Sequence, residues 1–171
     1  MTVDQLIARL DELQRTGAPL ERLLEEAMNG LHETDPRFHW TGIYELFEDQ
    51  MLRLGPFVGA PTDHVFIGVG NGVCGTAVAQ GRNMNVPDVR EITNYLACST
   101  ETRSELVVLI RDGEKIYGQI DIDSHRVAAF DEKTVAEVQR VADWLAGAYA
   151  AASAAKGAPP TARAASKKTP A

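Results

Sequence analysis

"SELVVLIRDGEKIYGQIDIDS", residues 104–124, is the stretch that decides the fold of this chain. At its middle, Asp112-Gly113 is a two-residue turn sequence of the kind that joins antiparallel strands. The runs on either side are rich in aliphatic and β-branched residues, which are enriched in strands. The stretch therefore predicts a β-hairpin.

The segments around this hairpin predict further strands and flanking helices. Residues 2–32 have apolar residues at helical spacing, with a break at "TGAP" (16–19), and predict two helices. Residues 131–150 predict a closing helix, and residues 74–81 a short one. Further strands are expected at 40–47, 51–58 and 64–69 and within 83–89. This order predicts an α+β fold in which helices flank an antiparallel sheet.

The net charge of −7 is unevenly distributed. Residues 151–171 contain four basic and no acidic side chains, so residues 1–150 carry −11. Nucleic-acid grooves need a basic surface, and the acidic body argues against one. The tail is rich in Ala, Pro and Lys and is expected to be disordered, because it cannot bury enough apolar surface. The folded domain is therefore expected to span residues 1–150.

The sequence also bears on location and assembly. It contains no run of about 18 apolar residues, and its N-terminus lacks the basic and apolar segments of a signal peptide. We expect a cytoplasmic protein that does not contact membranes. The amphipathic N-terminal helices are compatible with a homodimer.

"GNGVCG" (70–75) fits the letters of a dinucleotide-binding loop and contains Cys74. A dinucleotide site needs a βαβ unit with a full helix after the loop, whereas the helix expected here is short and the clearest strands form hairpins. The loop therefore favours a different interpretation, in which it presents a thiol. A cysteine at a helix N-terminus can have a lowered pKa.

Carboxylates converge on one face of the 104–124 hairpin. Alternation places Asp121 and Asp123 on the same face of their strand, about 7 Å apart, and hairpin pairing brings Glu105 opposite them. Two interpretations remain open, a solvent-facing surface or a patch that binds a cationic group such as an ammonium. No metal or other cofactor is expected, because the chain has no ion-binding loop and lacks zinc-site spacing among its candidate ligands, His64, Cys74, Cys98 and His125.

Several motifs in order resemble those of the free methionine-(R)-sulfoxide reductases, which are single GAF domains. They are "WTGIY", "LGPFVGAP", "GVGNGVCGTA", "VPDV", "YLACSTETRSELVV" and "GQIDIDS…FDE", and the likeness covers roughly residues 20–148. The resemblance implies a GAF-like antiparallel sheet of about six strands, with the N- and C-terminal helices packed on one face. It also implies free methionine R-sulfoxide as substrate and thioredoxin as reductant.

The resemblance assigns roles to individual residues. Cys98 matches the attacking cysteine and Cys74 a second cysteine that takes part in disulfide recycling. The other matches are substrate-binding residues: Glu105, Asp121, Asp123, Trp40 and, less closely, Tyr44.

The chemistry that follows is attack of Cys98 on the sulfoxide sulfur while an acid protonates the oxygen. The sulfenic acid formed on Cys98 would then condense with a thiol. One departure is that Asp63 stands where the family commonly has a third cysteine, which leaves Cys74 as the internal resolving thiol. The alternative is a non-catalytic GAF sensor that binds a small amino-acid-like ligand and signals through a partner.

Overall fold

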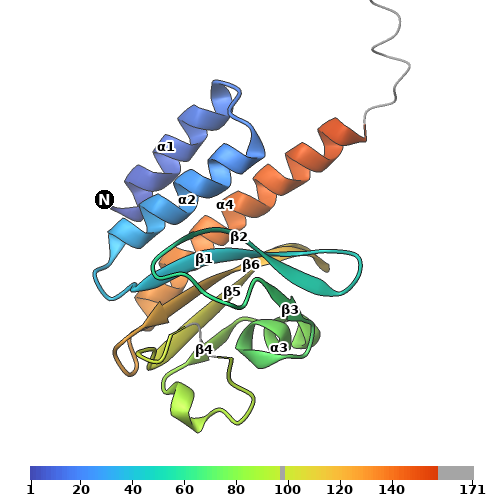
Figure 1. The fold of residues 1–171 in the computed structure, drawn as a ribbon. Helices are drawn as coiled ribbons and strands as arrows, with labels where there is room; N and C mark the ends of the chain where they lie inside the picture. The colour runs from blue at the N-terminus through green and yellow to red at the C-terminus, as the bar shows by residue number, and fades with distance from the viewer. Residues whose placement is uncertain (97–98, 158–171) are drawn as a thin grey trace, which may run out of the picture.

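A six-stranded sheet with helices on both faces forms the body of the molecule in the computed structural model, which describes residues 1–96 and 99–157 (Figure 1). The predicted α+β class, with a GAF-like sheet, is confirmed. In chain order the elements are α1 (Val3–Arg15), α2 (Leu20–Thr34), β1 (Trp40–Leu46), β2 (Met51–Val58), β3 (Phe66–Gly68), α3 (Gly72–Gln80), β4 (Met84–Val86), the 3₁₀ turn η1 (Val89–Glu91), β5 (Ser104–Asp112), β6 (Lys115–Ser124) and α4 (Glu132–Lys156).

The strands lie in the order β3-β2-β1-β6-β5-β4, and every neighbouring pair is antiparallel. The hairpin predicted at residues 104–124 is confirmed as β5 and β6, with Asp112 opposite Lys115 at the turn. The other edge of β6 pairs with β1. The hairpin therefore supplies two of the central strands, and the rest of the sheet is added on either side of it.

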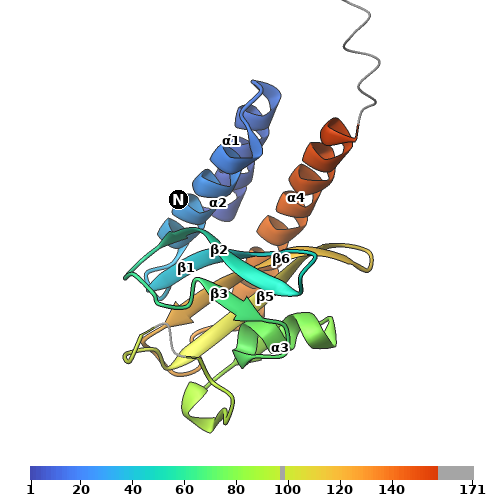
Figure 2. The ribbon, with the colours of Figure 1, turned by 45° about the vertical axis from the view of Figure 1, so that its right-hand side comes forward.

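Helices α1, α2 and α4 cover one face of the sheet, and α3 lies on the other (Figures 1 and 2). The core under the three helices joins aliphatic residues of the helices to the inward face of β5 and β6; it includes Leu6, Leu10, Met28, Leu106, Ile120, Ile122 and Leu145. The apolar stripes of α1 and α2 are thus used inside this chain. The amphipathic character of these helices is therefore explained within one chain and gives no support for a dimer. The homodimer stays a prediction.

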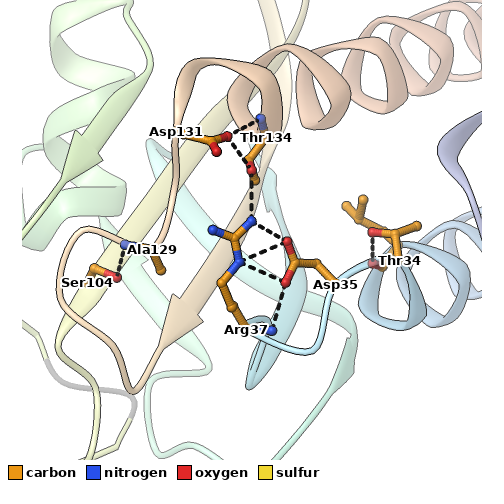
Figure 3. A network of polar contacts seen from close by, with 8 residues as sticks. Thr34, Asp35, Arg37, Ser104, Ala129, Asp131 and Thr134 are labelled. Atoms are coloured by element: carbon orange, nitrogen blue, oxygen red, sulfur yellow. Dashed lines mark hydrogen bonds and ion pairs between the residues drawn. The ribbon is translucent and has the colours of Figure 1, made fainter.

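The start of α4 is tied to the connection between α2 and β1 by a polar network (Figure 3). Asp131 caps the helix by accepting from the backbone N–H and the hydroxyl of Thr134, at 2.8 and 2.7 Å. Arg37 donates to the Thr134 hydroxyl at 3.1 Å and pairs with Asp35 at 2.5 Å. The guanidinium hydrogen bond lowers the pKa of Asp35. The network thus holds the segment just before β1 against the start of α4, and β1 carries two of the candidate site residues.

Two helix boundaries differ from the sequence expectation. α4 continues to Lys156, through residues 151–156 that were expected to belong to the tail. This extension consists mainly of alanine, which has the highest helix propensity, so local propensity outweighs the polar character of the tail. α3 begins at Gly72, two residues before the expected start, which places Cys74 in its first turn. The rest of the predicted tail, residues 158–171, lies outside the described residues.

In the described ranges, no helix has both the length and the apolar character needed to cross a bilayer.

Candidate active site

The three carboxylates predicted to converge do so, at the end of the β5–β6 hairpin away from its turn. Glu105 lies directly opposite Asp123 in the ladder, and Asp121 lies opposite Val107. The exposed fractions are 3% for Glu105, 1% for Asp123 and 0% for Asp121, so the face that carries them is buried. The solvent-facing interpretation of this strand surface is therefore wrong.

Cys74 joins this cluster from the first turn of α3. Its Sγ donates to Glu105 Oε1 at 3.7 Å. One ligand atom each from Cys74, Glu105 and Asp121 lies within 4.8 Å of the other two. A thiol and two carboxyl groups are thus in mutual reach. They are also groups of the kind that bind a divalent ion, so the expected absence of a metal stays a prediction.

Burial raises the pKa of two of these carboxyl groups, those of Glu105 and Asp121. It raises the pKa of Glu105 well above its ordinary value, and the neighbouring charges of Asp121 and Asp123 raise it further. Burial also raises the pKa of Asp121 to about 6, although the neighbouring Glu105 and Cys74 side chains oppose the shift. At neutral pH this arrangement favours a protonated Glu105 beside an ionised Asp121. The cluster therefore suits a pairing of an acid with an anion.

Trp40 and Tyr44 form an aromatic side of the same region. Trp40 lies opposite Asp123, because β1 pairs with β6, and the two rings stack with centroids 6.2 Å apart. Trp40 Nε1 donates to the carbonyl of Ala60 at 3.0 Å, and Tyr44 Oη donates to that of His64 at 2.8 Å. Both rings hold the loop between β2 and β3 against the site. This loop contains Asp63, which is exposed.

The 70–75 loop folds back on itself at the start of α3 and does not form a dinucleotide site. Gly70 N–H donates to the carbonyl of Gly75 at 2.8 Å. A side chain at Gly75 would collide with the carbonyl of Gly68, so only glycine fits there. The strand before the loop, β3, is a three-residue antiparallel strand. The βαβ unit that the dinucleotide pattern requires is not formed here.

The connection from η1 to β5 reaches the same loop. Asn94 Nδ2 donates to the carbonyl of Gly70 at 3.3 Å. A Cβ on Gly72 would come within 3.0 Å of the Leu96 side chain, so these two residues pack closely. Residues 94–96 therefore lie over the start of the helix that carries Cys74. Cys98, the predicted attacking cysteine, lies outside the described residues.

The structure thus places the described candidate residues close together, and their role in a site stays a prediction. One further buried polar residue lies beside them, and sequence reasoning did not single it out. Gln119 is fully buried on the same face of β6 as Asp121. The alternation of this strand shows its position, but a single glutamine in a strand carries no motif. The signal that distinguishes Gln119 is that its amide has no hydrogen-bond partner among the described residues, which only the folded chain reveals.

Comparison with known proteins gives a family for this chain. A model of the GAF domain matches residues 19–149. Protein YtsP of Bacillus subtilis is 43% identical over 103 residues, which are 60% of this chain and 63% of that protein. A protein of Escherichia coli K12 named free methionine-R-sulfoxide reductase is 39% identical over 103 residues, 60% of this chain and 61% of that protein. The chain thus spans a little over three-fifths of the length of these two curated relatives.

Solved structures resemble the chain over more of its length. A type II free methionine-R-sulfoxide reductase from Thermoplasma acidophilum superposes with a TM-score of 0.72 at 38% identity, covering 75% of this chain and 91% of that one. A free methionine-R-sulfoxide reductase of Neisseria meningitidis, in complex with its substrate, superposes with a TM-score of 0.81 at 28% identity, covering 90% and 91%. The chain belongs to the GAF-domain family, in the branch that contains the free methionine-R-sulfoxide reductases.

Proposed function

We propose that this chain reduces free methionine R-sulfoxide to methionine, with Cys98 as the attacking cysteine and Cys74 as the resolving one. The observation that carries the proposal is the buried contact between Cys74, Glu105 and Asp121 beside the Trp40 ring. The names of the relatives support the choice of substrate. The cytoplasmic location and thioredoxin as reductant are parts of the same proposal.

The carboxylate cluster suits the ammonium group of a free amino acid. Buried charges in proteins are usually paired, yet no lysine or arginine is among the groups that shift Glu105 or Asp121 within the described residues. A substrate ammonium supplies the missing positive charge. Trp40 offers an apolar surface for the methyl and methylene groups of the substrate.

Glu105 is the acid in the chemical step. The thiolate of Cys98 attacks the sulfoxide sulfur as Glu105 gives its proton to the sulfoxide oxygen. The S–O bond of the substrate breaks and the oxygen passes to Cys98 as a sulfenic acid. The substrate sulfur is reduced to the thioether of methionine, and the Cys98 sulfur is oxidised by two electrons.

Cys74 closes the cycle in this proposal. Its thiol attacks the sulfenic acid, which forms a disulfide and releases water, and a dithiol such as thioredoxin then reduces the disulfide. Leu96, two residues before Cys98 in the sequence, packs against Gly72, two residues before Cys74. This contact supports the pairing of the two cysteines. Asp63 in the exposed loop offers no third thiol.

Turnover with a small thiol tests the function directly. Purified protein supplied with dithiothreitol and methionine R-sulfoxide should form methionine, and the S epimer should react far more slowly. Cys98→Ser should abolish methionine formation, because it removes the nucleophile. A wild-type protein that binds an amino acid but forms no methionine would be a sensor, and the proposal would be wrong.

Recycling gives a second test. Cys74→Ser should lower turnover with thioredoxin by at least tenfold, because thioredoxin reduces a disulfide and none can form inside the chain. The same variant should keep most of its rate with dithiothreitol, which can reduce the Cys98 sulfenic acid itself. Both rates are measured by methionine formation, and Ser99→Ala serves as a control that leaves both cysteines in place. Equal rates for wild type and variant with thioredoxin would exclude Cys74 as the resolving thiol.

A further inference from the structure

Gln119 is a buried polar group that the fold leaves unused. Its exposed fraction is 0%, and among the described residues neither Oε1 nor Nε2 has a hydrogen-bond partner. Buried side-chain amides in folded proteins are almost always hydrogen-bonded, because leaving one unpaired is unfavourable. Gln119 lies two residues from Asp121, on the same face of β6. Within the described part of the chain, this amide is therefore free to bind a molecule that enters the site.

The surroundings of Gln119 select the kind of group it binds. Its neighbours across the ladder are Tyr44 in β1 and Leu109 in β5, both in the apolar cluster beneath α3. The Tyr44 hydroxyl already donates to the carbonyl of His64. A charged ammonium or carboxylate would be strongly disfavoured in such surroundings, whereas a neutral acceptor would not.

We propose that Gln119 is a further substrate-contacting residue whose side-chain N–H donates to the sulfoxide oxygen of the bound substrate; the inference rests on the function proposed above. The sulfoxide oxygen is the neutral acceptor of free methionine sulfoxide. It has lone pairs for more than one donor, so the contact is compatible with protonation by Glu105. Methionine lacks this oxygen. Gln119 therefore makes the site prefer substrate over product.

Binding of the two compounds to matched variants tests this role. Gln119→Met keeps the length of the side chain and removes the amide, and it is made in a Cys98→Ser protein so that substrate is not consumed. The variant should bind methionine R-sulfoxide about 3- to 10-fold more weakly by calorimetry, the loss expected for one neutral hydrogen bond. Its affinity for methionine should not change.

Leu109→Met is the control, because it alters packing at the cross-strand partner of Gln119 without touching the amide. It should leave the ratio of the two affinities unchanged. The inference would be overturned if Gln119→Met left the ratio of the affinities for methionine R-sulfoxide and methionine unchanged. This holds whether both affinities stay the same or both fall equally, and in either case the proposed function stands. If the protein with Gln119 intact binds neither compound, the proposed function fails and the inference falls with it.

Thermal unfolding of the ligand-free protein gives an independent measure. Gln119→Met should raise Tm by roughly 2–4 °C, because it removes an unpaired buried amide. A lower Tm would mean that the amide is paired inside the protein, and this too would overturn the inference.

Discussion

Replacing Glu105 with glutamine should lower the rate of methionine formation by about 10²- to 10⁴-fold, the usual contribution of a positioned acid. Glutamine has nearly the same shape but cannot give up a proton to the sulfoxide oxygen. Burial and the charges of Asp121 and Asp123 raise the pKa of Glu105 well above its ordinary value, which favours the protonated form that the proposed step uses. The measurement is kcat for methionine R-sulfoxide at pH 7 with saturating dithiothreitol.

Glu26→Gln is the matched control for this variant. Glu26 is also buried, but it lies in α2 and forms ion pairs with Arg9 at 2.7 Å and Arg22 at 3.2 Å. Its replacement should lower stability and leave kcat unchanged. A fall of only a few-fold in Glu105→Gln would show that another group protonates the oxygen.

Stability should respond to pH in the opposite sense from that of an ion-paired carboxylate. The pKa of Glu105 is higher in the folded chain than the value of about 4.3 in an unfolded one. Between these two pKa values the folded state holds a proton that the unfolded state has lost, so wild-type stability falls as pH rises through this window. Glutamine does not titrate. The free energy of unfolding of Glu105→Gln, relative to wild type, should therefore increase from pH 4 upwards.

The largest loss of stability is expected from Gly118→Ala. Gly118 lies opposite Glu45, where β6 passes very close to β1, and a Cβ there would overlap the carbonyl oxygen of Tyr44. The atoms that a Cβ would meet belong to the β1 backbone, which cannot move aside as a flexible side chain can. The two central strands β1 and β6 would therefore have to separate. We expect the free energy of unfolding to fall by about 3 kcal/mol, at the upper end of the usual range for overpacking. Urea denaturation measures this difference.

Gly147→Ala provides the comparison, because it makes the same chemical change in an open place. Gly147 is an exposed residue of α4, and nothing lies within 4 Å of a Cβ built on it. The substitution should stabilise the protein by about 0.5–1 kcal/mol, because alanine is the better helix former. If both variants unfold at the same urea concentration, β6 does not approach β1 as closely as described.

The parts of the fold that could be predicted are those whose signal is local. The Asp112-Gly113 turn specifies a hairpin on its own, and strand alternation then fixes which face Asp121 and Asp123 share. The capping box of Thr2 and Gln5 marks the start of α1 in the same way. Motifs of the family predict that Trp40 and Glu105 belong to one site, and each of them lies opposite Asp123 in the sheet.

What escaped prediction depends on contacts between distant segments. Whether the acidic face of β6 meets water or protein is decided by α3 and the β2–β3 loop, which cover it. The role proposed for Gln119 rests on the absence of a hydrogen-bond partner among the residues that the structure describes, and no sequence pattern encodes this. The end of α4 was misplaced because alanines in a polar segment suit a helix and a disordered tail equally well.

The two faces of β6 have different surroundings. Ile120 and Ile122 belong to the core beneath the long helices, while Gln119, Asp121 and Asp123 line the opposite side. Successive residues of one strand therefore have different surroundings, because one set packs in the core and the other lines the proposed site. Side chains of the second set can be replaced without altering the packing beneath the long helices, so the ligand preference of this architecture can be changed separately from its scaffold.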